Sequence, residues 1–297
     1  MSAWSTEIPL VGAGGEPVDL ARTIHSHGLV ELPPMEVDPV GPALTVTLLD
    51  GRRAKTLRIA AGRKGRLRVS ADAPADGLVP VVRHMLRLDE DFSGFYGAVA
   101  ADPDLAWAAS GAGRMIRSPT VFEDVVKTIC TTNCAWSATE RMVGALVGKL
   151  GVAARNGRRA FPTPEAMAAA DEAFYKDVVR AGYRGPYFRT LAADVAEGRL
   201  DLEALNDPEL PDEEVAARLL ALPGVGPYAT AHMMMLLGRY SRLILDSWTR
   251  PKYARLNGRK AGDKTIERRF RRYRAYAGLA FWLYLTRDWV AEPVGIK

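Results

Sequence analysis

The sequence is poor in the residues that build metal centres and disulfide frameworks. It has two cysteines, Cys130 and Cys134, and four histidines without ligand spacing among 297 residues. Two thiols cannot hold an iron–sulfur cluster, which usually takes four, and a zinc site needs closely spaced ligands. We therefore expect no metal and no cofactor, and two cysteines that pack on one helix in a reduced, cytoplasmic protein.

Two further absences narrow the class of protein. No apolar run reaches the roughly 18 residues that a membrane span needs, and the start, MSAWSTEIPL, lacks the basic and apolar segments of a secretory signal. The sequence also has no low-complexity stretch and no fixed-period repeat. With 48% hydrophobic residues, we expect a globular chain of two or three units with no membrane partner.

Residues 41–70 have the alternating pattern of β-strands. Apolar side chains recur at every second position, and an Asp-Gly pair marks a hairpin. Residues 77–88 then favour a helix, and the later part of the chain has helical spacing. The prediction is an α+β fold, with a small antiparallel sheet and a helix in residues 1–92 and a mostly helical part in 93–297.

The net charge of the chain is a modest +5, but positive and negative residues are unevenly distributed along the sequence. Residues 239–274 contain thirteen lysines and arginines against three acidic residues, a net charge of +10, so the rest of the chain carries −5. A run of charge is often only a solvated helix face. Segregation of this size instead favours a polyanionic partner, and nucleic acid is the leading candidate.

The stretch LPGVG, residues 222–226, predicts a tight turn between two helices. Glycine lets the backbone turn sharply and present its amides without a Cβ in the way. Pro227 suits the first position of the second helix, and Gly238 suits the position beyond its end. The N–H groups from Gly226 onward then point outward at a helix N-terminus, where partial positive charge favours a phosphate.

A lone aspartate, Asp246, follows the apolar run of residues 243–245. One interpretation is that it caps a helix starting near Ser247. The other is a chemical role, and both can hold, because a capping position keeps the carboxylate ionised beside a cleft. A carboxylate near a nucleic-acid backbone does not favour binding, but it stabilises a cation such as the oxocarbenium sugar of N-glycosidic cleavage.

These features in this order resemble the helix-hairpin-helix DNA glycosylases. Residues 222–228 followed by Asp246 look like their phosphate-gripping hairpin and base-excising aspartate. SPTVFEDVVKTICTTNCAWS resembles their lesion-reaching helix, and YRAYAGLAFWLYLTRDW is similar to the last helix of the 3-methyladenine DNA glycosylase II and 8-oxoguanine branch. The resemblance covers most of the chain. It implies a monomer whose active-site cleft lies between helical subdomains. It also implies that the partner is double-stranded DNA with damaged bases, which the protein would meet at the bacterial nucleoid.

The resemblance also separates two chemistries. Bifunctional members carry a lysine two residues after the second hairpin glycine, where it forms a Schiff base with the sugar; here that residue is Tyr228. A phenol forms no imine. We therefore predict a monofunctional enzyme of base excision repair without AP lyase activity, in which Asp246 assists cleavage and water attacks the sugar.

The substrate prediction depends on positions where this chain departs from the pattern of the 8-oxoguanine glycosylases. An 8-oxoguanine-type enzyme is the alternative prediction. Those members carry a glutamine where this chain has Phe281 and an arginine where it has Ala138. Aromatic residues instead favour alkylated purines such as 3-methyladenine, because these are cations that stack on aromatic rings. Each aromatic also has a core-packing interpretation, which we prefer for Trp282. The predicted pocket residues are Trp136, Tyr228, His232, Trp248 and Phe281.

Eight residues are expected to contact DNA. Asn133 matches the family's position for a residue inserted toward the orphaned base, and Tyr183-Arg184 matches a second wedge, which extrusion of a nucleotide requires. Alternatively, Asn133 caps a helix. Arg250 either contacts a phosphate or pairs with Asp246. The predicted set is Gly224, Val225, Gly226, Tyr228, Arg250, Asn133, Tyr183 and Arg184.

Two other functions fit the same residues. A non-catalytic lesion-binding protein of this fold would share the hairpin and the basic segment but would not need Asp246. A hydrolase of free nucleosides would use Asp246 but would have no use for the basic segment. The N-terminal sheet shows no residues with chemistry of its own, which predicts an accessory role.

Overall fold

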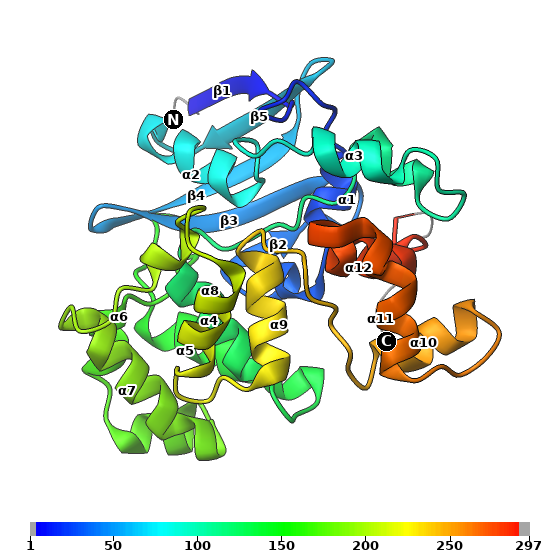
Figure 1. The fold of residues 1–297 in the computed structure, drawn as a ribbon. Helices are drawn as coiled ribbons and strands as arrows, with labels where there is room; N and C mark the ends of the chain where they lie inside the picture. The colour runs from blue at the N-terminus through cyan, green and yellow to red at the C-terminus, as the bar shows by residue number, and fades with distance from the viewer. Residues whose placement is uncertain (1–3, 291–297) are drawn as a thin grey trace.

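Five antiparallel strands form one sheet in the N-terminal part of the chain (Figure 1). The structure, a computed structural model, describes residues 4–290. Three of the strands lie where the alternating pattern predicts them, and two were not predicted. The order across the sheet is β1-β5-β4-β3-β2, with β1 Trp4–Pro9, β2 Met35–Val37, β3 Ala43–Asp50, β4 Arg53–Ala61 and β5 Arg66–Ala71.

The period of two gives the sheet one buried face. Leu44 of β3 pairs with Ile59 of β4, which pairs in turn with Val69 of β5, and all three side chains are fully buried. Each such burial stabilises the fold by about 1.5–3 kcal/mol. Helices α1 (Leu20–Ile24) and α2 (Val79–Met85), the second of which was predicted, pack against this core.

Six helices of the middle part surround a second core. Their apolar faces meet around Val125, Leu146 and Met233, which are fully buried. Figure 1 shows α9 on the side of this group that faces the C-terminal helices. The six are α4 (Val121–Thr131), α5 (Trp136–Leu150), α6 (Pro164–Ala168), α7 (Gly185–Ala196), α8 (Asp212–Leu220) and α9 (Pro227–Leu236).

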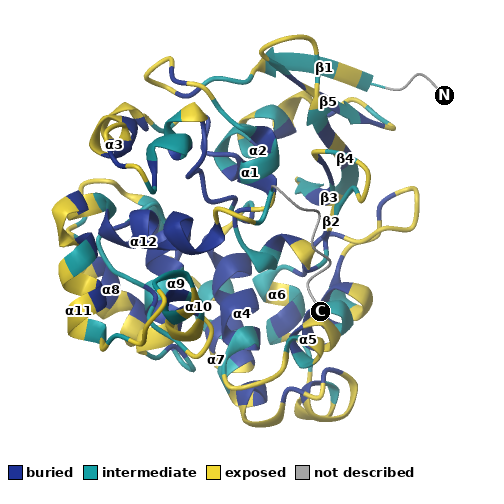
Figure 2. Ribbon diagram, turned by 90° about the vertical axis from the view of Figure 1, so that its right-hand side faces the viewer, coloured by how far each residue is buried: buried dark blue, intermediate teal, exposed yellow. Residues whose placement is uncertain are grey.

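The remaining helices enclose a third core that is rich in aromatic rings. Phe270 and Phe281 pack edge to face with ring centroids 5.2 Å apart, a favourable arrangement. Every residue of α12 is buried, and Figure 2 shows it in dark blue. Within residues 4–290, no helix has both the length and the apolar character that crossing a membrane requires. These helices are α3 (Ser93–Val99), α10 (Thr249–Leu256), α11 (Asp263–Phe270) and α12 (Ala277–Thr286).

The third core draws on two stretches that are distant in the sequence. Phe92, Tyr96 and Met115 pack with the C-terminal helices, whereas Ile116 belongs to the core beneath the sheet. The chain therefore passes from the sheet to the C-terminal core and back before the middle helices begin. The boundary expected between residues 92 and 93 stays a prediction.

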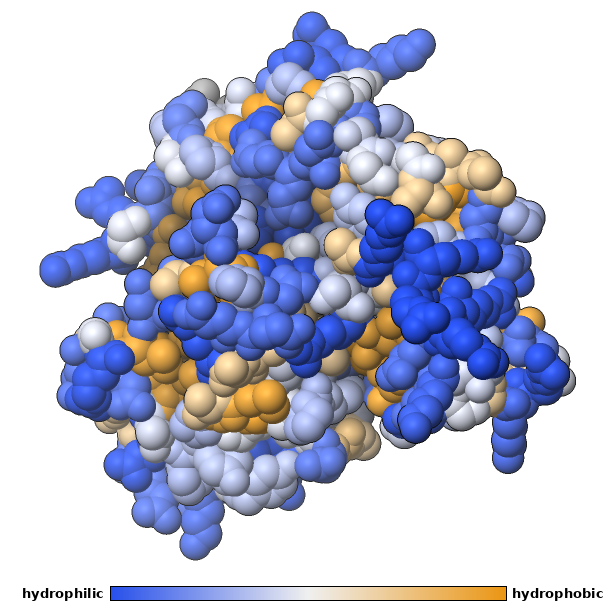
Figure 3. Space-filling view, in the orientation of Figure 1, coloured by the Kyte–Doolittle hydropathy of each residue, from blue (hydrophilic) through white to orange (hydrophobic). Residues whose placement is uncertain are grey.

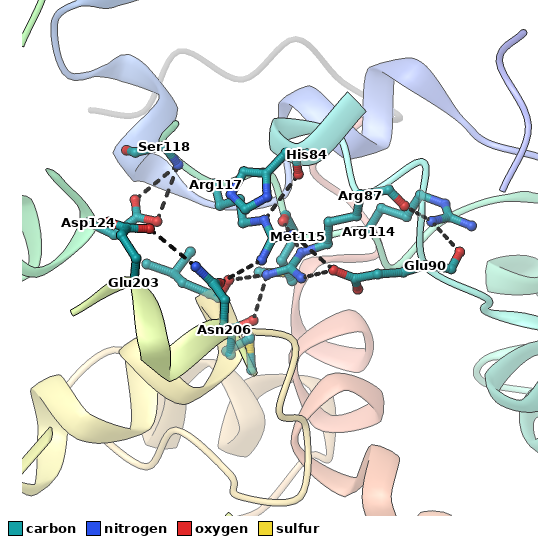
Figure 4. Close-up of polar contacts among 12 residues, drawn as sticks. His84, Arg87, Glu90, Arg114, Met115, Arg117, Ser118, Asp124, Glu203 and Asn206 are labelled. Atoms are coloured by element: carbon teal, nitrogen blue, oxygen red, sulfur yellow. Dashed lines mark hydrogen bonds and ion pairs between the residues drawn. The ribbon is translucent and has the colours of Figure 1, made fainter. Parts of the chain in front are cut away.

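A buried arginine joins the three parts (Figure 4). Arg87, which is fully buried, donates to the carbonyl of Met115 at 2.6 Å and to the Glu90 carboxylate at 2.5 Å. It also donates to the carbonyl of Leu236, the last residue of α9. A buried guanidinium is costly unless its donors are used. Arg87 therefore fixes the C-terminal end of α9 against the sheet part and the segment before α4.

Candidate active site

The predicted hairpin joins α8 to α9, and its two glycines have different roles. Gly224 has a φ of +78°, and a Cβ there would lie 2.6 Å from Cδ2 of Tyr187. Gly226 is extended, and a Cβ there would have no heavy atom within 4 Å. Val225 is 7% exposed and anchors the turn in the middle core. Only Gly224 is required by the turn; Gly226 instead leaves open space in front of α9.

The N-terminus of α9 is free to bind an anion. Gly226 is its N-cap residue and has no side chain to cap the helix, and among the described residues no capping hydrogen bond replaces it. The first helical hydrogen bond runs from the N–H of Thr230 to the carbonyl of Gly226 at 2.9 Å. Pro227 has no N–H, so the amides of Tyr228 and Ala229 lack a partner within the helix. Together with the helix dipole, they can hold a phosphate oxygen.

Asp246 lies near the end of the segment that leads from α9 to α10. Its side chain caps the turn just ahead of α10. Its Oδ1 atom accepts hydrogen bonds from the N–H groups of Trp248 at 2.8 Å and Thr249 at 2.6 Å. Its own N–H donates to Oγ1 of Thr249 at 2.8 Å. The capping interpretation is therefore correct. The same carboxylate also lines a groove of about 750 Å³ with Gly224, Gly226 and Tyr228.

The surroundings of Asp246 keep it ionised. Burial alone would raise the pKa of this carboxyl, but contact with His232 and the hydrogen bonds from residues 248 and 249 lower it to about 2. The Nε2 atom of His232 lies 3.8 Å from Oδ2, which is longer than a hydrogen bond. The carboxylate is thus negative at any physiological pH.

A cavity of about 290 Å³ adjoins this groove, in the lower range for small-molecule sites. Thr131, Cys134 and Tyr228 line both spaces, so the cavity opens beside Asp246. Within the described chain, no lysine, arginine, aspartate or glutamate lines the cavity. Its lining residues are His27, Gly28, Leu29, Met115, Thr128, Thr131, Cys134, Trp136, Thr139, Tyr228, His232, Met235, Leu236, Ile244 and Trp282.

Aromatic rings form much of the cavity wall. The rings of Tyr228 and His232 lie 4.4 Å apart. Trp282 donates from Nε1 to the carbonyl of Ser26 at 2.7 Å, which satisfies the indole N–H and leaves its ring against the cavity. Trp248 is 39% exposed and packs against Trp282 with ring centroids 5.6 Å apart and the ring planes tilted by 44°. It lines the groove rather than the cavity.

Of the five predicted pocket residues, Trp136, Tyr228 and His232 line the cavity, whereas Trp248 and Phe281 do not. The other lining residues, among them Trp282 and His27, were not predicted. Phe281 lies in the third core against Phe270 and Tyr253, fully buried, and does not line the cavity. Trp282, the next residue, was expected to pack and lines it instead. His27 lines it from the N-terminal part of the chain, just ahead of a short 3-10 helix and outside the strands. Because α12 is apolar on every side, its spacing gave no signal for the face toward the cavity.

Two arginines expected to contact DNA are used within the protein. Arg184 is 6% exposed and donates to the carbonyl of Ile129 at 3.2 Å and to the carbonyl of Thr132. It therefore stabilises the C-terminal end of α4. Arg250 pairs with Asp263 at 2.8 and 2.9 Å, so its carboxylate partner is not Asp246, one of the two partners considered from the sequence. Its contact with a phosphate stays a prediction.

The other predicted contacts lie along the groove. Asn133 has a φ of +46° just beyond the end of α4, and its Nδ2 donates to the hydroxyl of Tyr183 at 3.3 Å. Tyr183 is 53% exposed, and both residues line the groove that contains Asp246. Their contacts with DNA stay predictions. Of the cysteines, Cys130 is buried as expected, whereas Cys134 lies beyond the helix and is exposed.

Comparison with known proteins begins with sequence. No family model matches the chain. A Bacillus subtilis protein provisionally named DNA-3-methyladenine glycosylase YfjP is 26% identical over 155 residues. The match includes 50% of this chain and 52% of that protein, so the chain spans about half the length of the curated relative it matches.

Solved structures match nearly the whole chain. The 3-methyladenine DNA-glycosylase of Archaeoglobus fulgidus has a TM-score of 0.72 at 22% identity, covering 95% of this chain and 97% of its own. The apo-form 8-oxoguanine glycosylase/lyase of Clostridium acetobutylicum has a TM-score of 0.71 at 18% identity, covering 95% and 94%. The expected α+β architecture is confirmed, and the chain has the fold of the 3-methyladenine and 8-oxoguanine DNA glycosylases.

Proposed function

We propose that this protein is a DNA glycosylase that removes a damaged base by hydrolysis. One observation carries the proposal: an ionised carboxylate, Asp246, stands between an uncapped helix N-terminus and an uncharged, aromatic cavity. The helix end suits a DNA phosphate, and the cavity suits an extruded base. A carboxylate at their junction is then close to the deoxyribose.

The reaction follows from this arrangement. The bond between C1′ of the sugar and the base nitrogen breaks, and its electron pair leaves with the base. Positive charge develops on the sugar, where the Asp246 carboxylate stabilises it. Water adds to C1′ and loses a proton, which completes hydrolysis. The hydrogen bonds from Trp248 and Thr249 hold the carboxylate in place during these steps.

Hydrolysis without lyase activity is supported by the residues around the groove. A Schiff base needs an amine near C1′. Within residues 4–290, no lysine lines the groove or the cavity, and Tyr228 stands where bifunctional members of the resembled family have theirs. Tyr228 lies at the junction of the two spaces, where a phenol can pack or take part in hydrogen bonds but cannot form an imine.

The cavity supports an alkylated purine as the excised base. Such a base is cationic, and the faces of Trp136, Tyr228 and Trp282 can attract it. His27 does not oppose this charge, because burial, despite its hydrogen bond to the Ile116 carbonyl, lowers the pKa of its imidazole to about 4. A neutral base such as 8-oxoguanine would gain less from these rings. The second candidate, an 8-oxoguanine enzyme, is favoured only by the shared fold.

The test is base release from a panel of damaged duplexes. Wild-type protein should release purines from methylated duplex DNA faster than 8-oxoguanine, with strand breaks appearing only after alkali. Borohydride should trap no covalent complex. A trapped complex would overturn the hydrolytic mechanism, and selective release of 8-oxoguanine would favour the second candidate.

Asp246→Asn separates an enzyme from a lesion-binding protein. Loss of the charge should reduce base release on the order of 10²- to 10³-fold while DNA binding persists. Asp263→Asn is the matched control, because it removes an exposed carboxylate whose one ion-pair partner in residues 4–290 is Arg250. Equal base release by Asp246→Asn and wild type would refute the proposed role of Asp246, and DNA binding by wild type without release of any base would favour the binder. Release from free nucleosides but not from duplexes would favour a nucleoside hydrolase.

A further inference from the structure

The basic segment of residues 239–274 is only partly available to a partner. Six of its thirteen cations form ion pairs with acidic side chains, several of them far away in the sequence. Arg269, for example, pairs with Asp104 at 3.0 Å. The six paired cations are Arg239, Arg242, Arg250, Lys252, Arg269 and Arg272.

Four of the remaining cations line a single groove of about 830 Å³. Lys264 and Arg268 come from α11, and Arg271 and Arg274 from the 3-10 helix Arg271–Tyr276 that follows it. Within residues 4–290, none of these four forms an ion pair. The groove also contains Arg242, whose charge Glu213 neutralises, and one further carboxylate, Glu267. Its net charge is therefore +3, and Figure 3 shows hydrophilic side chains gathered over this region.

This groove meets the hairpin. Pro227, the first residue of α9, lines both the basic groove and the groove that contains Asp246. An anionic chain held at the N-terminus of α9 can thus continue between α9 and α11. Thr230 also lines the basic groove; it is 2% exposed, and its hydroxyl has no hydrogen-bond partner among the described residues. A buried hydroxyl without a partner is costly, and a ligand oxygen would satisfy it.

We propose that the basic groove binds the phosphodiester backbone of the DNA beyond the damaged site. α11 is eight residues long, about 12 Å, which matches three to four base steps along one strand. Continuity with the hairpin favours a polyanion that spans both sites over a small anion that fills one. The inference rests on the proposed function for its DNA, but its test needs no base release.

The test measures how binding of a long undamaged duplex depends on salt. The triple variant Arg268→Ser, Arg271→Ser and Arg274→Ser removes three exposed cations from the groove. Each phosphate contact contributes about 0.9 to the slope of log affinity against log salt, so the slope should become shallower by about 2.7. The single variant Arg271→Ser should change it by about 0.9. For a short duplex that does not reach beyond the hairpin, wild type and variant should bind alike.

The matched control removes three exposed cations at or beside the hairpin turns of the sheet: Arg52→Ser, Arg53→Ser and Lys64→Ser. Both triple variants carry the same net charge, so a change confined to the groove variant cannot come from net charge. Equal slopes for the two triple variants, or no binding of undamaged duplex by wild type, would overturn the proposal. If the slopes of the two triple variants differ but wild type releases no base, the result would count against the proposed function and not against the basic groove as a DNA site.

Discussion

His232 Nε2 lies 3.8 Å from Oδ2 of Asp246, and within the described residues this buried nitrogen has no hydrogen-bond partner. His232 lies in the middle of α9, and Asp246 lies in the segment just before α10. Their contact therefore ties the cavity wall to the carboxylate. His232 also packs against Tyr228, so it acts as a positioning residue for the proposed reaction.

Replacement of His232 by leucine should weaken the proposed reaction without weakening DNA binding. The carboxylate loses a neighbour that favours its charged form, so we expect kcat to fall roughly tenfold and the pKa of Asp246 to rise from about 2. The carbon-13 shift of labelled aspartate, followed during acid titration, measures that pKa. His232→Gln should restore part of kcat, and an effect on KM alone would contradict the positioning role.

Adjacent residues of α12 should separate stability from substrate choice. Trp282→Leu removes a ring from the cavity wall, so the preference for cationic over neutral bases should fall between about 3- and 30-fold in kcat/KM. Phe281→Leu alters the third core instead and should lower the free energy of unfolding by about 1 kcal/mol with the preference unchanged. Chemical denaturation and competition between the two lesion types measure these effects. A change of preference in Phe281→Leu would contradict the placement of Phe281 outside the cavity wall.

Features that depend on neighbouring residues could be predicted from the sequence. Alternation indicates β3 to β5, and Pro227 marks the start of α9 because proline suits a first turn. The cap at Asp246 follows from its place before a helix. The resemblance to a known family added the order of the helices and the general position of the cleft.

Features that depend on distant partners could not be predicted. Arg250 and Arg184 looked available for DNA because nothing nearby in the sequence opposes or buries them. Only the fold brings Asp263 to the first and the end of α4 to the second. The same holds for His27, which reaches the cavity from far upstream. A side chain's partner, rather than its type, decides whether its charge serves folding or binding.

His27 should make stability fall as the pH falls. Burial, opposed by its hydrogen bond to the Ile116 carbonyl, lowers its folded pKa from 6.5 to about 4. Between these values the unfolded chain binds a proton that the folded protein does not, so stability decreases as pH drops from about 6.5 to 4. We expect the free energy of unfolding to fall by about 1–3 kcal/mol over this pH range. The range extends below the full value of the shift because one side of the His27 ring borders the cavity.

The variant His27→Gln checks this assignment, because it keeps a donor and an acceptor but does not titrate. Urea unfolding of both proteins at several pH values should give curves that converge or cross toward pH 4, with the larger loss in wild type. Measurement at pH 8 gives the effect of the substitution itself. Parallel curves would mean that His27 binds its proton equally well in the folded protein.

The two hairpin glycines should respond differently to alanine, because only one is required by the turn. In Gly224→Ala the residue would be held at a positive φ with its Cβ against Tyr187, so the free energy of unfolding should fall by about 2 kcal/mol or more. In Gly226→Ala the backbone is extended and the Cβ meets open space, so stability should change by less than about 0.5 kcal/mol.

The Cβ added in Gly226→Ala would stand where a phosphate approaches the amides of α9, so DNA affinity should fall roughly tenfold. Thermal unfolding and DNA titration of both variants measure the contrast, and unchanged DNA affinity in Gly226→Ala would show that the phosphate does not bind at this helix end.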